Sequence, residues 1–238
     1  MSDELINIGE AAGRLGVSID TLRRWDERGK LRAIRTSGEH RVYRPHDIEI
    51  FLSDLLFIAS EWVSDQEPQE LSGNVYCPTS QVFQARLGSM QAVLKEAHAI
   101  DYFSLLVAIA GEIGDNSFAH NLGNWPDASG VFFAFDVHKK HIVLADRGQG
   151  VLKTLKRVRP LLTTHEDALR VAFTEVVTGR EPETRGNGLK FVRQVIRDYP
   201  IDLAFQTGDA LLNLKRKQSE LNITHQLSIK GCLAIITF

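Results

Sequence analysis

Cysteine is scarce in this chain, since 238 residues contain only Cys77 and Cys232. Two cysteines cannot build a disulfide framework, so the fold must depend on a packed core, and a reducing compartment is expected. Long hydrophobic runs are missing as well, because Ile50–Ala59 contains Asp54 and Leu105–Ile113 is too short to cross a bilayer. The first residues are polar and acidic, so no signal peptide is expected. These absences predict a cytoplasmic protein that does not enter a membrane.

A large net charge is also absent, because the formal value is −2 at pH 7. The charge is unevenly distributed, however, and one short stretch is strongly basic. Between residues 21 and 44 the basic residues are Arg23, Arg24, Arg28, Lys30, Arg32, Arg35, Arg41 and Arg44, and the acidic ones are Asp26, Glu27 and Glu39. A locally basic segment in a nearly neutral chain predicts one face that binds a polyanion.

Short helices are predicted for the N-terminal part of the chain. Apolar residues recur at helical spacing over Ile8–Leu15, and a second apolar face, capped by Ser18, runs from Ile19 to Trp25. A small hairpin is expected over 31–43, and a helix is expected from Pro45 through about Ser60. Two short helices joined by a tight turn suit the major groove of DNA, where arginine bridges phosphates or reads guanine. The alternative is that these arginines form a solvated helix face.

The N-terminal stretch resembles the winged helix-turn-helix of the MerR and excisionase group. The matching features are Gly16-Val17-Ser18, Thr21-Leu22-Arg23-Arg24-Trp25, Gly29-Lys30-Leu31, Arg41-Val42-Tyr43-Arg44 and Asp47-Ile48. The resemblance implies a recognition helix over Ser18–Arg28, a wing over Arg35–Arg44 and double-stranded DNA as the partner. The expected DNA contacts are Ser18, Thr21, Arg23, Arg24, Arg35, Arg41, Tyr43 and Arg44. The long dimerising helix of MerR regulators is not expected, because a polar stretch with Pro68 intervenes, so a homodimer is left open.

A second domain is predicted after the polar linker Asp65–Gly73. The expected boundaries are a DNA-binding domain over 1–62, a linker over 63–78 and an α+β domain over 79–238. The predicted elements are helices over Gln81–His98, Tyr102–Leu122, Val151–Gly179 and Gly186–Tyr199, and strands over Val131–Asp136, His141–Ala145, Leu203–Gln206, Leu211–Lys215, Thr224–Ile229 and Cys232–Phe238. This order predicts a multidomain protein: an all-α N-terminal module and a C-terminal sandwich of helices on a mixed sheet.

Polar residues that suit a nucleotide occur on one predicted helix of the C-terminal domain. Glu112 and Asn116 are four residues apart and therefore share a helix face. A carboxylate and an amide on a buried face are costly unless they serve a function. An amide oxygen together with phosphates is a usual environment for Mg²⁺, and a nearby carboxylate can orient water.

Two glycine motifs follow. Asp146–Gly150 (DRGQG) comes directly after a strand, where the carboxylate can accept a hydrogen bond from the adenine amino group and the glycines permit a close backbone approach. Thr184–Leu189 (TRGNGL) opens a helix whose free amides suit phosphates. Each motif alone is weak, because a DxGxG sequence is often only a turn. Their order and spacing together are the stronger signal.

Together the three motifs resemble the Bergerat-type ATP-binding fold of the gyrase, histidine kinase and MutL group. The resemblance implies that Asn116 coordinates Mg²⁺, that Glu112 stands at the position of the hydrolytic base, that Asp146 binds adenine and that Val151–Arg185 forms a lid. The residues expected to contact Mg-ATP are Asn116, Asp146, Gly148, Gly150, Arg185, Gly186, Asn187, Gly188 and Leu189. Arg185 and Lys190 stand where further glycines are common in this group.

Three functions remain open at this stage. The favoured hypothesis is an ATP-responsive DNA-binding transcriptional regulator. The alternatives are a serine/threonine protein kinase of the anti-sigma type, which modifies a protein partner, and a DNA-associated ATPase. Glu112 favours hydrolysis over binding alone, but a resemblance in fold does not establish the chemistry.

Overall fold

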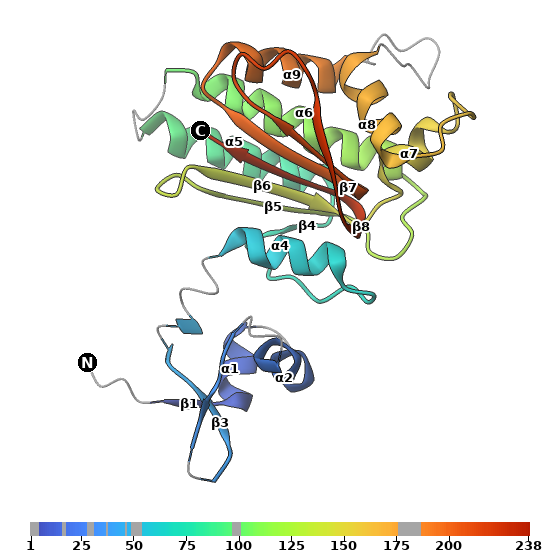
Figure 1. Ribbon diagram of the computed structural model, residues 1–238. Helices are drawn as coiled ribbons and strands as arrows, with labels where there is room; N and C mark the ends of the chain where they lie inside the picture. Colours follow the sequence, from blue (N-terminus) through green and yellow to red (C-terminus); the bar gives the residue numbers. More distant parts are fainter. Residues whose placement is uncertain are drawn as a thin grey trace. The chain divides into compact units, whose positions relative to one another are not determined.

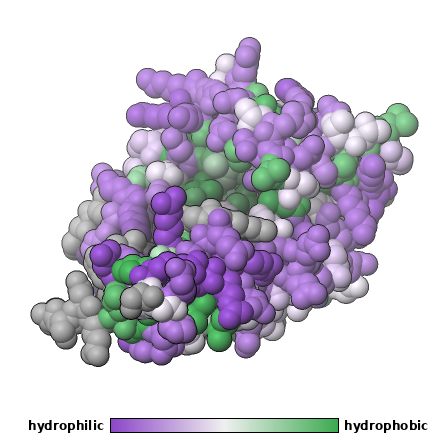
Figure 2. Space-filling model, turned by 60° about the horizontal axis from the view of Figure 1, so that its bottom comes forward, coloured by the Kyte–Doolittle hydropathy of each residue, from purple (hydrophilic) through white to green (hydrophobic). Residues whose placement is uncertain are grey.

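The computed structural model describes residues 5–15, 18–27, 31–36, 38–45, 47–48, 54–96, 101–175 and 187–238. The chain divides into two compact units, one comprising Met1–Ile58 with Gln69–Ser72 and the other Ala59–Pro68 with Gly73–Phe238. Within the described residues, no helix has both the length and the apolar character needed to cross a membrane. The coloured part of the surface in Figure 2 is mostly hydrophilic, with hydrophobic residues in small separate groups.

The first unit combines helices with a small sheet. Its elements are α1 (Ile8–Leu15), α2 (Ile19–Glu27) and the antiparallel strands β1 (Ile6–Asn7), β3 (Arg41–Tyr43) and β2 (Ile34–Arg35), in that order across the sheet (Figure 1). The predicted cap of α2 is present, because the amide of Thr21 donates to Ser18 Oγ at 3.1 Å. Leu22 and Trp25 bury the apolar face of α2, whereas Ile19 is 40% exposed. The sequence had predicted an all-α unit. The small sheet shows that this prediction is wrong.

The helix expected from Pro45 to Ser60 is not continuous. Pro45, Asp47 and Ile48 are helical, residues 46 and 49–53 lie outside the described part, and Asp54 is not helical. Helix α4 (Leu55–Ser64) then begins, and the Asp54 carboxylate accepts a hydrogen bond from the amide of Phe57 at 3.1 Å. Such a side-chain cap satisfies a free amide at a helix start, so Asp54 separates the two helical stretches.

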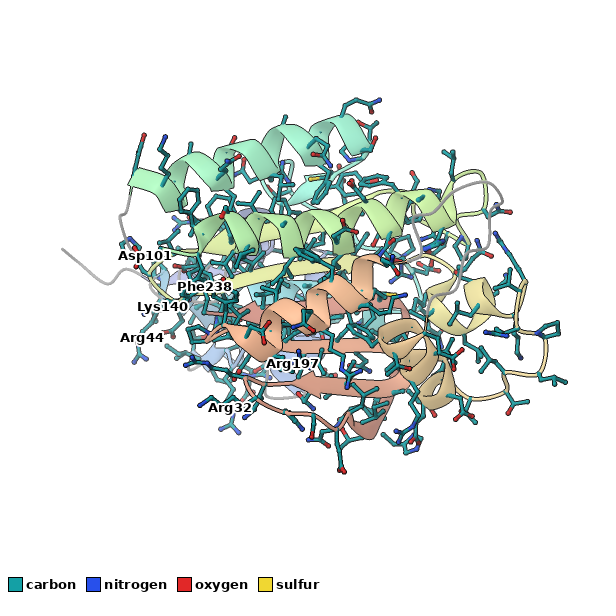
Figure 3. The ribbon with its side chains drawn as sticks, turned by 90° about the horizontal axis from the view of Figure 1, so that it is seen from above. Arg32, Arg44, Asp101, Lys140, Arg197 and Phe238 are labelled. Carbon is teal, nitrogen blue, oxygen red and sulfur yellow. The ribbon has the colours of Figure 1, made fainter. Side chains whose placement is uncertain are left out.

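The second unit is built on a five-stranded sheet in the order β4-β5-β6-β8-β7. Its strands are β4 (Tyr76–Cys77), β5 (Val131–Asp136), β6 (His141–Asp146), β7 (Asp202–Leu214) and β8 (Asn222–Thr237). Its main helices are α5 (Ser80–Glu96), α6 (Phe103–Asn121), α8 (His165–Thr174) and α9 (Gly188–Asp198), which cover one face of the sheet (Figures 1 and 3). The chain ends beside the β5–β6 turn, where the Phe238 amide donates to the Lys140 carbonyl at 3.2 Å (Figure 3).

Three predictions for the second unit need correction. The sheet is not mixed, because every described strand pair is antiparallel. The four expected tail strands are two long ones, β7 and β8, whose pairing is interrupted by register shifts near Gly208. The stretch from Val151 is not one helix: α7 (Gly150–Leu155) and α8 are separated by turns around Pro160, and residues 176–186 lie outside the described part. Proline cannot continue a helix, which explains the break.

The opposite face of the sheet is also buried. Phe132 and Val143, which alternate with the residues of the main core, are fully buried. The ring of Trp62, in the part of α4 that belongs to this unit, lies 6.4 Å from the ring of Tyr76. Tyr76 is paired with Phe132 across β4 and β5, so both side chains lie on the same face of the sheet. The end of α4 therefore packs against the second face.

Candidate functional site

A cavity of about 770 Å³ lies in the second unit and joins all three predicted motifs. It is lined by one face of α6, the end of β6, α7 and the start of α9. The predicted site residues that line it are Glu112, Asn116, Asp146, Gly150, Asn187, Gly188 and Leu189. Its volume is in the range of small-molecule and cofactor sites. Arg185 and Gly186 lie outside the described residues.

One end of the cavity is formed by Asp146, which is only 2% exposed. The hydroxyl of Ser117 donates to Asp146 Oδ2 at 2.7 Å, and the amide of Gly148 donates to Oδ1 at 2.8 Å. Burial raises the pKa of the Asp146 carboxyl, whereas these two hydrogen bonds act in the opposite direction. A third hydrogen bond comes from the Cys232 backbone, so the carboxylate is fixed in direction where it lines the cavity.

The loop after β6 is held closely to its neighbours, and this explains its glycines. A Cβ on Gly148 would lie 2.0 Å from Asn121 Nδ2, and a Cβ on Gly150 would lie 2.9 Å from Thr207 Oγ1 at a φ of +72°. Asn121 Oδ1 accepts the amide of Gln149 at 2.8 Å. Gly148 does not line the large cavity, contrary to the prediction, and its amide instead orients Asp146.

Four residues of this end were missed by sequence reasoning: Ser117, Asn121, Thr207 and Gly231. The hydroxyl of Thr207 accepts the Val151 amide at 3.1 Å and donates to the Gly231 carbonyl at 2.9 Å. A signal existed for the pair on α6, because Ser117 directly follows Asn116, and Ser117 and Asn121 are four residues apart. The β7 and β8 residues gave no local signal, since only long-range strand pairing brings them to the loop.

The other end of the cavity is formed by Glu112, Asn116 and the start of α9. A Cβ on Gly188 would lie 2.2 Å from Glu112 Oε2 and 3.7 Å from Asn116 Nδ2, so Gly188 brings the start of α9 close to both side chains. Asn187 is the N-cap residue of α9, but its side chain makes no capping hydrogen bond. The first amides of α9 therefore lack a side-chain acceptor from Asn187 and can receive an anionic group. The sequence had placed Glu112 and Asn116 on a buried helix face. In the structure Glu112 is exposed and Asn116 is half-buried, so this face of α6 is only partly buried.

Among the described residues, no group of three or more His, Cys, Asp or Glu side chains is arranged to hold a metal ion. A resident metal held by the protein alone therefore has no ligand set in this part of the chain. Asn116 could supply one oxygen to a cation that takes its other ligands from phosphates and water, which is a common arrangement for Mg²⁺.

In the first unit, the predicted DNA-contact arginines fall into two groups, one that does not pair with Asp26 and one that does; Arg35, which pairs with it, is still 44% exposed. Arg23, Arg24 and Arg44 are exposed, although Arg23 forms an ion pair with Asp20 at 2.8 Å. Arg32, which was not among the predicted contacts, is also exposed. Arg24 donates to the hydroxyl of the buried Thr21 at 3.3 Å, so Arg23 and Arg24 would each give up a contact on their own helix to reach a phosphate.

The second group is bound to Asp26, whose side chain is 10% exposed. Arg41 and Arg35 contact Asp26 Oδ2 at 2.7 and 2.9 Å, and the Ala33 amide donates to Oδ1 at 2.9 Å. Burial alone would raise the pKa of Asp26, but these hydrogen bonds and the charges of Arg41 and Arg35 outweigh it and lower the pKa. Asp26 therefore fastens α2 to the β2–β3 hairpin.

Three further predicted contacts are part of the unit's own structure. Tyr43 is 1% exposed, and its hydroxyl has no hydrogen-bond partner among the described residues. Thr21 is 6% exposed, and its hydroxyl lies 2.9 Å from that of Ser18, which caps α2. The sequence had placed all three side chains at a DNA surface, whereas Tyr43 packs in the core and Thr21 is buried at the helix cap. Ser18 is exposed, and its contact with DNA stays a prediction.

Residues 7–43 match the model described as the MerR family regulatory protein. This segment is therefore a MerR-type helix-turn-helix, which indicates DNA binding and transcription regulation. The chain is also similar to the Type II methyltransferase M.Eco47II of Escherichia coli, with 35% identity over 77 residues. That match covers 32% of this chain and 18% of the methyltransferase, so the chain spans less than a fifth of this curated relative.

Proposed function

We propose that the second unit binds Mg-ATP in the cavity around Asp146, and that nucleotide binding regulates a DNA-binding domain over residues 1–62. The observation that carries the proposal is the meeting of three separate motifs in one cavity of about 770 Å³. Helices packed on an antiparallel sheet support a Bergerat-type fold for residues 79–238, with 63–78 as the linker. The MerR-type segment supplies the DNA-binding part.

The Asp146 end of the cavity suits adenine. Its buried carboxylate can accept the exocyclic amino group, and Ser117 holds the carboxylate in place. Val151, Leu155 and Phe205 line the same cavity and offer apolar surface for the base. A buried acceptor left without a donor is costly, so a base without an amino group at that position should bind less well.

The Glu112–Gly188 end suits the phosphates. The start of α9 offers backbone amides and the positive end of a helix dipole. Asn116 would hold Mg²⁺, together with phosphate oxygens, and the ion would neutralise phosphate charge there. The motif residues Arg185 and Gly186 belong to the same proposal, as do the contacts expected of Asn187, Gly188 and Leu189.

An enzymatic function is the second candidate, because Glu112 lies beside Gly188 in the phosphate end. A carboxylate there can take a proton from water, which would give an ATPase, or from a serine or threonine hydroxyl of a partner, which would give a protein kinase. ATP labelled in its γ-phosphate separates these outcomes. Free labelled phosphate indicates an ATPase, label on a protein indicates a kinase, and intact ATP indicates regulation by binding.

The proposed ligand set is tested by calorimetric titration with a non-hydrolysable ATP analogue, with and without Mg²⁺. Asn116→Ala should remove the magnesium dependence of binding, because the variant lacks the amide oxygen. Asn124→Ala is the matched control, since Asn124 is exposed after a turn and its side chain donates to the Leu122 carbonyl, away from the cavity. Equal magnesium dependence in wild type and Asn116→Ala would contradict the assignment.

A further inference from the structure

Arg147 lies between Asp146 and Gly148 in sequence. Its side chain, however, makes its hydrogen bonds on the side of the loop that faces away from the large cavity. It is fully buried and does not line the large cavity. Its guanidinium donates to Asp127, with the shortest contact at 2.6 Å from Nη2 to Oδ2. It also donates to three backbone carbonyls, those of Trp62, Asp65 and Gln66. A planar group with five donors can hold several acceptors at once.

The acceptors belong to the end of α4 and the turn that follows it, residues 62–66. Trp62 and Val63 are buried, so this segment is packed as well as hydrogen-bonded. The carbonyls at the end of a helix lack intrahelical donors, and a cation there satisfies them. Helix α4 begins at Leu55, within the unit that contains the MerR-type segment, and ends in the unit that contains the cavity.

A second cation strengthens the same connection. Lys230 donates to Asp127 Oδ2 at 2.7 Å and also to the Gln66 carbonyl. Lys230 directly precedes Gly231, where an added Cβ would lie 2.1 Å from the Asp146 carbonyl oxygen. Burial would raise the pKa of Asp127, but Arg147 and Lys230 hold it well below its usual range. Residues 62–66 are thus fastened from both strands that border the Asp146 loop.

We propose that Arg147 transmits nucleotide occupancy of the Asp146 cavity to residues 62–66 and so to α4, the helix shared in sequence by both units. The inference rests on the proposed nucleotide site. Asp146 and Arg147 are neighbours in the chain. A ligand that restrains the Asp146 carboxylate in the cavity therefore also restrains the Arg147 backbone and the guanidinium that binds residues 62–66. Energetic coupling between two places can be carried by a chain of packed and hydrogen-bonded side chains, and these contacts form such a chain.

Hydrogen–deuterium exchange of the full-length protein tests this connection with the ATP analogue and Mg²⁺. The amide of Asp65, which donates to the Glu61 carbonyl at 2.9 Å, reports on the segment directly. In wild type, nucleotide should slow exchange in residues 62–66 by about fivefold, although no described residue of this segment lines the cavity. Arg147→Lys keeps the charge but loses the fork of donors, so the nucleotide should change exchange there by less than about twofold.

The control is Arg86→Lys, which removes a comparable guanidinium that donates to the Gly73 carbonyl at 2.6 Å but lies on α5. It should leave the nucleotide response of residues 62–66 unchanged. Should Arg147→Lys fail to fold, Lys230→Gln replaces it, because its partly exposed side chain holds the same segment more weakly. We expect it to halve the response while nucleotide affinity stays within about threefold of wild type.

The outcomes separate this inference from the proposed function. Absence of nucleotide binding by wild type would overturn both. Nucleotide that protects the Asp146 loop but leaves exchange in residues 62–66 unchanged would overturn the Arg147 connection and leave the nucleotide site standing. An undiminished response in folded Arg147→Lys, or in Lys230→Gln when the former does not fold, would also overturn it.

Discussion

The two units hold their polar groups in different ways. In the first unit, Arg44 is exposed at the surface, whereas Arg41 is held by Asp26. In the second unit, Asp146 is buried and held by Ser117 and a backbone amide. The difference fits recognition of an extended polyanion on one hand and of a small enclosed ligand on the other. A surface site depends on which charges remain free, and an enclosed site depends on how firmly its groups are oriented.

The largest effect is expected where the enclosed site has no free space. Gly231 has a φ of +62°, and an added Cβ would lie 2.5 Å from Asp146 Oδ1. Gly231→Ala should therefore lower the free energy of unfolding by about 3 kcal/mol and displace Asp146. Gly123→Ala is the control, because its φ of +72° is similar but nothing lies within 4 Å of the new Cβ. It should cost only about 1 kcal/mol. Equal losses in chemical denaturation would show that the Asp146 contacts do not matter.

In the first unit, the largest effect is expected from Asp26→Ala, which releases both Arg35 and Arg41. Loss of this buried carboxylate should cost about 2 kcal/mol at neutral pH. Because the folded-state pKa of Asp26 is lowered, its contribution is present above the unfolded value of about 4 and is lost as the pH falls through the folded value. The difference between variant and wild type should therefore disappear in acid.

Asp20→Ala provides the comparison for Asp26, since Asp20 pairs with Arg23 but its side chain is 83% exposed. Its stability should match wild type, because exposed ion pairs contribute little. Both variants should bind mixed-sequence duplex DNA more tightly at low salt, since each removes a negative charge near arginines. Thermal unfolding across pH and DNA titration measure the two effects. A stability loss in Asp20→Ala as large as that in Asp26→Ala would contradict the distinction between free and held arginines.

A smaller effect is expected from Ser117→Ala, which removes one donor to Asp146. Affinity for ATP should fall about tenfold at neutral pH. Burial already raises the pKa of Asp146, and loss of the Ser117 hydrogen bond should raise it further. Binding that needs the ionised carboxylate should then decline at a higher pH in the variant than in wild type. Ser117→Thr keeps a hydroxyl and should restore the wild-type pH profile, whereas an unshifted profile in Ser117→Ala would rule out this role.

The smallest effect is expected from Tyr43→Phe. The Tyr43 hydroxyl is buried without a described partner, and burial raises its pKa. Removing it should leave DNA affinity unchanged and stabilise the unit by less than about 1 kcal/mol. An affinity loss of more than threefold in a DNA titration would restore Tyr43 as a phosphate contact.

Local sequence patterns predicted most helices and strands of both units but not the residues at which they begin and end. The long apolar stretch of α6 and the short apolar runs of β5 and β6, joined by a polar turn, are local signals, and these predicted elements are confirmed. The break at Asp54 was missed because a capping carboxylate inside an apolar helical stretch was not weighed against the periodicity. The length of β7 and β8 was missed because glycines at their irregular positions were taken as strand ends.

The candidate site shows the same division between local and long-range information. Glu112, Asn116 and Asp146 were predicted from spacing, and the structure places them around one cavity. Thr207 and Gly231 could not be predicted, because their roles arise only when β7 and β8 pair beside the loop. The DNA-contact prediction identified the right residue types but not which arginines are paired within the unit. Arg35 and Arg41 are paired because the fold brings them to Asp26.

Binding of adenine by Asp146 can be measured by calorimetric titration of wild type and Asp146→Asn with Mg-ATP. Wild type should bind one ATP per chain saturably, and the variant, which replaces one acceptor oxygen by a donor amide, should lose about 10- to 100-fold in affinity with its fold intact. Wild type should also prefer ATP to GTP, which lacks the amino group at that position. An unchanged affinity in the folded variant, or no saturable binding by wild type, would contradict the account.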